Sequence, residues 1–397
     1  MLIKFKNHSV MWMRQNTTRI VIIVVSVSVA LYFVPYSKYA LIYFYTIFFV
    51  LSIYLTIITR GRAQNVFLTF STIWLCLGVL EAIAIRIDTR PSESREGGGF
   101  ARQATLGWGL SGPGVQKHKK IAQNGSVIFD VAYAIDEHLN RKVVSAETGP
   151  VVAFFGDSMT FGEGLPDDET LPQSFADLTG RKMRVHNFGV PGYGPQQFLR
   201  ALETDMFDPL LRDNAKLFVY LTAPWHAERT SCRVGYVALA PNYELQDGRP
   251  SFKGACYQRA STVLGMLGDI VGRTATYKVF VPRLQTPVYP QDVELYIRIL
   301  IRAGELARQK YGVPTLVLYL GDWPEYMAKL GYTDAQVMAR LRVGGLQVVE
   351  ATIDQSAYPN QPLRIPGDGH PTGLANKIRA QMVRDALADA RLNEGRP

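Results

Sequence analysis

Hydrophobic and polar positions divide this chain into two parts. The first part contains three long apolar stretches, at about residues 20–36, 39–58 and 66–87. A helix needs roughly 20 apolar residues to cross the hydrocarbon core of a bilayer, so the second and third stretches predict transmembrane helices. The first stretch is shorter, and a tight hairpin would join it to the second. We therefore expect residues 1–88 to form a membrane domain with three transmembrane helices.

Two other interpretations of the first stretch stay open. Ser28-Val29-Ala30 has the small-x-small pattern of a signal-peptidase site, although it lies inside the apolar run. The stretch could also be re-entrant, which would leave two true spans. The number of spans matters because an even number would place the rest of the chain on the other side of the membrane.

Basic residues predict the orientation. They precede the first stretch and follow the second, as Lys4, Lys6, Arg14, Arg19, Arg60 and Arg62, whereas the hairpin between these stretches has only Lys38. Positively charged flanks stay in the cytoplasm. Three spans then place everything after about Asp88 outside the cytoplasm. The expected location is a bacterial inner membrane, with the soluble part in the periplasm.

Short apolar runs alternate with helical patterns after residue 148. Strands are predicted at 151–155, 183–187, 217–221, 315–320 and 346–351, and helices at 171–178, 196–205, 293–310, 334–342 and 372–392. This alternation is typical of a parallel sheet covered by helices on both faces. The expected fold class is therefore α/β, with an N-terminal transmembrane segment before the sheet domain.

Two segments fall outside this alternation. Residues 89–148 are expected to be a linker followed by a lead-in β-hairpin, because residues 89–114 are rich in Gly, Ser and Pro. The hairpin would pair residues 127–135 with residues 141–144. Residues from about 223 to 290 interrupt the alternation and are expected to be an insertion in the domain that spans 149–397.

The charge balance favours a membrane surface over nucleic acid. Lys and Arg exceed Asp and Glu by 43 to 34, which gives a net charge of +9. Apart from the membrane flanks and a short cluster at Lys117, Lys119 and Lys120, the basic residues are scattered. A nucleic-acid-binding domain would gather them on one face, so no nucleic-acid partner is expected.

The soluble part contains two cysteines, Cys232 and Cys256. Disulfides persist in oxidising compartments such as the periplasm, so we predict a Cys232–Cys256 bridge. Two buried free thiols are the alternative. Neither cysteine has a second Cys or His at the spacing of a zinc site, so no metal is expected.

Three short blocks carry candidate chemistry. Gly156-Asp157-Ser158 directly follows the most apolar predicted strand, where Ser158 could be a nucleophile or a helix cap. Asn187-Phe188-Gly189 follows the next strand. Asp368-Gly369-His370 precedes the last helix, and an acid beside a histidine can supply a base and the group that orients it. Each block taken alone also fits a structural turn.

The order and context of these blocks resemble the SGNH, or GDSL-type, hydrolases, over about residues 149–387. The resemblance implies a flavodoxin-like three-layer α/β/α fold and esterase or acyl-transfer chemistry without a cofactor. It assigns Ser158 as nucleophile, Asp368 and His370 as acid and general base, and the backbone N–H groups of Ser158 and Gly189 as oxyanion-hole donors.

The chain departs from this family at two places. The usual third block supplies an oxyanion-hole asparagine, but here Thr222-Ala223-Pro224-Trp225-His226 follows the strand. His226 could donate to the oxyanion instead, or could be a structural loop residue. The acid also lies two residues before the histidine, where three is usual. We further expect Asp157, Asn187 and Arg229 to contact the substrate, Arg229 by binding an acidic group.

These features predict an anchored esterase or O-acyltransferase that acts on acyl, most simply acetyl, esters of a cell-envelope or exported glycan. A lipid-directed esterase or thioesterase is a rival within enzymes. Outside enzymes, the chain could be a degenerate SGNH fold that binds glycan or scaffolds an export complex. The helices would contact lipid and could also contact a membrane protein of the same pathway. Glu81, near the outer end of the third stretch, favours a pairing or interface role.

Overall fold

The computed structural model describes residues 40–88, 90–256, 271–272, 274–280 and 288–394. The chain forms two compact units. The helical unit comprises Met1–Thr89 with Met266–Gln285, and the α/β unit comprises Arg90–Gly265 with Thr286–Pro397. The expected insertion therefore does not belong wholly to the sheet domain, because part of it groups with the helices.

The helical unit contains a hairpin of two apolar helices, α2 (Ala40–Ile58) and α3 (Arg62–Ile87). Within the described residues, both are long and apolar enough to cross a membrane. They pack through aromatic rings, with Trp74 of α3 against Phe44 and Phe48 of α2. Both helices were expected and are consistent with a membrane anchor. The first predicted span, at 20–36, lies outside the described residues.

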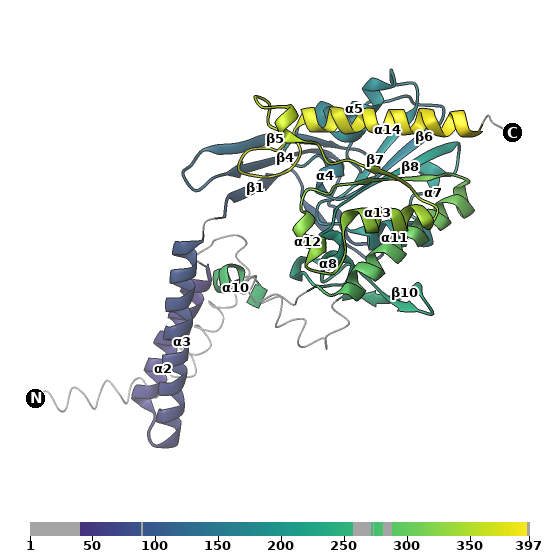
Figure 1. The fold of residues 1–397 in the computed structure, drawn as a ribbon. Coiled ribbons are helices and arrows are strands. Elements are labelled where there is room, and N and C mark those ends of the chain that lie inside the picture. The colour runs from purple at the N-terminus through teal and green to yellow at the C-terminus, as the bar shows by residue number, and fades with distance from the viewer. Residues whose placement is uncertain (1–39, 89, 257–270, 273, 281–287, 395–397) are drawn as a thin grey trace, which may run out of the picture. The chain divides into compact units, whose positions relative to one another are not determined.

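Glu81 of α3 caps a short helix, α10 (Ala275–Phe280), which lies beside α3 (Figure 1). The Glu81 carboxylate accepts the backbone N–H groups of Ala275 at 2.6 Å and Thr276 at 3.0 Å, and the Thr276 hydroxyl at 2.7 Å. A carboxylate at a helix N-terminus satisfies free N–H groups and complements the helix dipole. The partner of the buried Glu81 is thus the insertion segment.

The α/β unit is built on a five-stranded parallel sheet. Its strands are β6 (Val151–Gly156), β7 (Arg184–Gly189), β8 (Ala215–Thr222), β11 (Thr315–Tyr319) and β12 (Gln347–Glu350). Their order is β12-β11-β8-β6-β7. This is the flavodoxin-like order 2-1-3-4-5, read from the other edge. The predicted α/β fold class is confirmed.

Helices cover both faces of this sheet (Figure 1). One face carries α5 (Leu171–Leu178) and α14 (Gly373–Glu394), and the other carries α6 (Pro195–Glu203), α11 (Pro290–Tyr311) and α13 (Asp334–Val343). Alternate residues of β6 enter the two cores: Phe155 packs with the α6 and α11 side, and Phe154 with the α5 and α14 side. Burial on both faces explains the continuous apolar run.

The segment that was expected to be a linker contains strands between residues 92 and 110. β1 (Ser92–Glu96) joins β4 (Gly114–Ile121) and β5 (Val127–Ile135) in an antiparallel sheet, and β2 (Phe100–Gln103) pairs with β3 (Gly107–Leu110). β4 pairs along the length of β5, and the expected pairing with residues 141–144 is limited to the end of β5, where Arg141 bridges Ile135 and the Lys142 N–H donates to the Ala134 carbonyl at 2.8 Å. Polar and glycine-rich segments become strands here because neighbouring strands supply their backbone hydrogen bonds.

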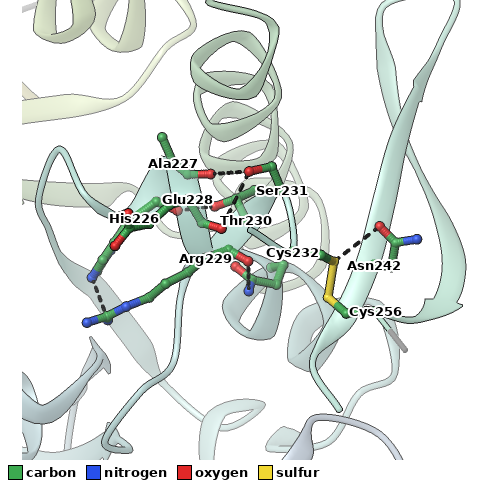
Figure 2. The surroundings of a disulfide bond; sticks show 10 residues. His226, Ala227, Glu228, Arg229, Thr230, Ser231, Cys232, Asn242 and Cys256 are labelled. Carbon is green, nitrogen blue, oxygen red and sulfur yellow. Dashed lines mark hydrogen bonds between the residues drawn. A yellow bond between two sulfur atoms is a disulfide. The ribbon is translucent and has the colours of Figure 1, made fainter. Parts of the chain in front are cut away.

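Shorter elements complete the unit. They are α4 (Ser158–Phe161), α7 (Asp208–Leu211), α8 (His226–Thr230), α12 (Pro324–Ala328) and the hairpin of β9 (Pro241–Gln246) with β10 (Arg249–Ala255). Figure 2 shows the predicted Cys232–Cys256 disulfide, which links the end of α8 to the end of β10. Its Cα atoms are 5.6 Å apart.

Candidate active site

The site lies at the carboxyl ends of the central strands, where ligands bind in open α/β sheets. β6 ends at Gly156, whose φ of +153° favours glycine, and a Cβ there would collide with Thr160. Asp157 then caps α4, because its Oδ1 accepts the Met159 N–H at 2.9 Å. This strand–turn–helix places Ser158 at the first position of α4.

The structure brings Ser158, His370 and Asp368 together. His370 Nε2 lies 2.8 Å from Ser158 Oγ, although the residues are 212 positions apart. On the other side of the ring, Nδ1 bonds to Asp368 Oδ2. If Nδ1 carries the proton, Nε2 is free to accept the Ser158 hydroxyl proton. This is the arrangement that a nucleophile, a base and an orienting acid require.

Charges around the pair keep the acid ionised and strengthen the base. Burial lowers the pKa of His370, but the hydrogen bond that His370 donates to Asp368 and the negative charge of Glu163 outweigh it, so the net pKa is raised. Burial would raise the pKa of Asp368, yet its bonds to His370 and Lys120 hold it well below the usual range. Asp368 therefore stays a carboxylate that stabilises a protonated His370.

Sequence reasoning missed a charged cluster beside His370, formed by Glu93, Arg95, His118, Lys120 and Glu163. Lys120 Nζ lies 2.7 Å from Asp368 Oδ1, and Glu163 Oε2 lies 3.7 Å from His370 Nε2. The basic cluster around Lys120 was visible in the sequence. Its partner was not, because Asp368 lies 248 positions away.

Three members of the cluster have the side chains of a metal site. Ligand atoms of Glu93, His118 and Glu163 all lie within 4.8 Å of one another. Protein cations already neutralise the carboxylates: Arg95 Nη2 is 2.7 Å from Glu163 Oε1, and Lys120 Nζ is 3.1 Å from Glu93 Oε1. A metal ion would have to displace both, so we assign no metal here.

The two expected oxyanion donors, the N–H groups of Ser158 and Gly189, differ in whether they already have a hydrogen-bond acceptor. The Ser158 N–H lies in the first turn of α4, where backbone N–H groups have no acceptor within the helix. The Gly189 N–H instead donates to Asn187 Oδ1 at 3.0 Å. Asn187 Nδ2 donates to the Thr160 carbonyl at 3.1 Å. Asn187, expected at the substrate, thus ties the β7 loop to α4.

His226 is fully buried and bonded within the protein. Its Nδ1 lies 3.1 Å from Thr222 Oγ1, and its Nε2 lies 3.2 Å from Asp157 Oδ2. Burial lowers the pKa of His226, and the adjacent Arg229 lowers it further, so the ring is neutral at pH 7. Both ring nitrogens already have partners, which places His226 in a structural network and not among the oxyanion donors.

Arg229 and Asp157 form a buried ion pair at 2.7 Å. Arg229 also donates to the Tyr193 carbonyl at 2.7 Å and to the Tyr236 hydroxyl at 2.8 Å. Burial would raise the pKa of Asp157, but Arg229 and His226 hold it far below the usual range. The residues expected to contact substrate therefore bind each other, and Figure 2 shows Arg229 reaching His226 from α8.

Arg141 is a further residue whose role the sequence did not reveal. Its buried guanidinium donates to the carbonyls of Phe161 at 2.9 Å, Gly162 at 2.6 Å and Leu165 at 2.6 Å. Isolated bridges link Arg141 to β5 and to β7. Arg141 thus fixes the loop that leads from α4 to Glu163 and joins the lead-in sheet to the central sheet.

No protein-family model matches the chain, and no curated protein matches it. Among solved structures it is similar to AlinE4, an SGNH-hydrolase family esterase, at 19% identity over 62% of this chain and 98% of that one, with a TM-score of 0.31. It is also similar to a catalytic mutant of Axe2, an acetylxylan esterase from Geobacillus stearothermophilus, at 11% identity, 62% and 96% coverage and a TM-score of 0.32.

A third similar structure is LAE5, an alpha/beta hydrolase enzyme from the metagenome of Lake Arreo, Spain. Its identity is 14%, its coverage 62% of this chain and 97% of that one, and its TM-score 0.35. The similar structures thus include an SGNH-family esterase and an acetylxylan esterase.

Proposed function

We propose that this chain is a serine-dependent ester hydrolase or O-acyltransferase of SGNH type. The observation that carries the proposal is the contact of Ser158 Oγ with His370 Nε2 at 2.8 Å, together with the bond from His370 Nδ1 to Asp368. A serine used only as a helix cap would not need a histidine and an acid aligned behind it.

The reaction follows from these contacts. Ser158 Oγ attacks the ester carbonyl while its proton passes to His370 Nε2, and Asp368 stabilises the imidazolium. The Ser158 N–H holds the oxyanion, and the Gly189 N–H joins it if the substrate displaces Asn187 Oδ1. Collapse breaks the ester bond, and His370 returns the proton to the leaving alcohol. Water or an acceptor hydroxyl then attacks the acyl-serine with His370 again as base.

The setting favours an esterified glycan outside the cytoplasm. Two apolar helices support a membrane anchor, and the Cys232–Cys256 disulfide supports an oxidising compartment. Basic residues on the flanks of the apolar stretches support an orientation with the α/β unit outside the cytoplasm. An enzyme fixed there would meet cell-envelope or exported glycan, whose O-acetyl groups are oxygen esters suited to this site.

One observation favours a second candidate, a catalytically degenerate subunit that binds or scaffolds glycan. The Gly189 N–H is bonded within the protein, and the buried His226 lies in the block where the SGNH family usually has an oxyanion-hole asparagine. Loss of a single oxyanion donor typically costs on the order of 10²–10³ in rate. A site that keeps only the Ser158 N–H would turn over slowly.

Serine labelling separates the two candidates. The full chain in detergent is treated with a fluorophosphonate, and acetyl release is measured from a panel of acetylated glycans. An enzyme is labelled at Ser158 and releases acetate, and both signals are lost in Ser158→Ala. The outcome that favours the binding subunit is a folded wild-type protein that is not labelled and that releases no more acetate than Ser158→Ala.

A further inference from the structure

One face of the antiparallel β1–β4 pair carries charged side chains to the catalytic histidine. In the register of the two strands, Glu93 lies opposite Lys120, and Arg95 lies opposite His118. Side chains two apart on a strand share a face, so His118 and Lys120 point the same way. This sheet precedes the hydrolase core in the sequence and lay outside the predicted resemblance to the SGNH family.

Lys120 fixes the carboxylate of Asp368. Its Nζ lies 2.7 Å from Oδ1, whereas the other oxygen, Oδ2, bonds to His370. The Asp368 side chain is 0% exposed, so it needs partners on both oxygens. Glu93 holds Lys120 from the opposite strand at 3.1 Å. With each oxygen bonded, the carboxylate cannot rotate away from the imidazole.

Glu163 places a second carboxylate on the reactive side of the ring. Its Oε2 lies 3.7 Å from His370 Nε2, the nitrogen that faces Ser158. This distance is too long for a hydrogen bond but short enough for charge attraction. Arg95 holds the other oxygen, Oε1, at 2.7 Å. Glu163 is therefore held where it stabilises the imidazolium formed during attack.

We propose that Lys120 and Glu163 are positioning residues of the catalytic site, which hold Asp368 and His370 in place and balance the charge around the imidazole. The inference rests on the proposed function, since it concerns the base that activates Ser158. The β1–β4 pair then contributes Lys120 to the active site. Lys120 and Glu163 should affect the pKa of His370 in opposite directions, because their charges have opposite sign.

Other charged groups near His370 also contribute. They are Asp368 on its own loop, Asp157 at the start of α4, Glu163 after α4, and Glu93, Arg95, His118 and Lys120 on the β1–β4 pair. Arg364 donates to the Gly369 carbonyl at 2.9 Å and is itself paired with Asp322. Removal of Glu163 leaves the carboxylates of Asp368 and Asp157 near His370, so His370 remains a general base but a weaker one.

The test is the pH dependence of fluorophosphonate labelling of Ser158 in the full chain. This labelling reaction requires neutral His370, and it can be measured without knowing the substrate. Loss of the negative charge in Glu163→Gln should move the acidic midpoint down by on the order of one pH unit. Loss of the positive charge in Lys120→Met should move it up and slow labelling. Lys120→Arg keeps the charge and should restore the wild-type midpoint.

Lys119→Met is the matched control. Lys119 lies on the opposite face of β4 and pairs with Asp130 at 2.8 Å, so its loss should leave the midpoint unchanged. Coincident midpoints for wild type, Glu163→Gln and Lys120→Met would overturn the inference. If Lys120→Met does not fold, Glu163→Gln alone decides by the direction of its shift. Wild-type protein that is not labelled at any pH would instead overturn the proposed function.

Discussion

Glu163 Oε2 lies 3.7 Å from His370 Nε2, the nitrogen that contacts Ser158 Oγ. This nitrogen therefore faces one carboxylate, while Asp368 bonds to Nδ1 on the other side of the ring. Both carboxylates favour the protonated imidazole. The base is thus flanked by negative charge on its two nitrogens, and this arrangement determines how the site responds to pH.

The pH dependence should reflect a His370 pKa above the ordinary value of about 6.5. Only neutral His370 can accept the Ser158 proton, so labelling should fall about tenfold per unit below a midpoint that lies above pH 6.5. Rates of fluorophosphonate labelling between pH 4 and 9 would measure this. A rate that stays flat down to pH 5 would contradict it.

The same shift affects stability with a defined sign. Because folding raises the pKa of His370, its contribution is fully present below the unfolded pKa of about 6.5 and is lost as pH rises through the folded pKa. The difference in free energy of unfolding between wild type and His370→Gln should therefore become smaller as pH rises from 6 to 9. Thermal unfolding of both proteins across this range gives the comparison.

Arg229→Met should strongly destabilise the α/β unit. The substitution leaves the Asp157 carboxylate buried without its cation, which typically costs about 3–5 kcal/mol. Urea unfolding followed by tryptophan fluorescence would measure the change. Arg181→Met removes an exposed partner of Asp177 and should cost below about 1 kcal/mol. Equal losses in the two variants would refute the structural role of Arg229.

Replacement of both soluble cysteines by serine should lower stability by about 3 kcal/mol, because the Cys232–Cys256 bridge closes a loop of 24 residues. The melting temperature of the variant should no longer respond to a reducing agent, whereas that of wild type should fall. Cys76→Ser is the control and should behave like wild type. A wild-type protein insensitive to reduction would argue against the bridge.

Glu81→Ala should loosen α10 in the helical unit. Hydrogen bonds to charged groups contribute about 1.5–3 kcal/mol, so amide exchange at Ala275 and Thr276 should accelerate at least about tenfold. Hydrogen exchange with mass spectrometry in detergent would detect this. Glu137→Gln, at an exposed position of the α/β unit, serves as control. Unchanged exchange would mean that Glu81 does not cap α10.

Local pattern in the sequence determined most of the sheet and the core of the site. The apolar run of β6 predicts burial on both faces, and the helix α5 was predicted with the bounds that it has in the structure. Gly156, Asp157 and Ser158 specify a strand–turn–helix through backbone geometry and capping. These features depend on residues only a few positions apart, so a single sequence is enough to recognise them.

Only the tertiary structure decided what the charged residues do. Arg229 was expected at the substrate, and His226 was open between an oxyanion donor and a structural loop residue. Both contact Asp157, some 70 positions away, because a buried carboxylate requires such partners. In the sequence Lys120 is one residue of a basic cluster, and only the fold shows that it contacts Asp368. Residues 92–96 became a strand only because β4 offers them hydrogen bonds. Pairing between distant segments depends on the whole fold, which no local pattern encodes.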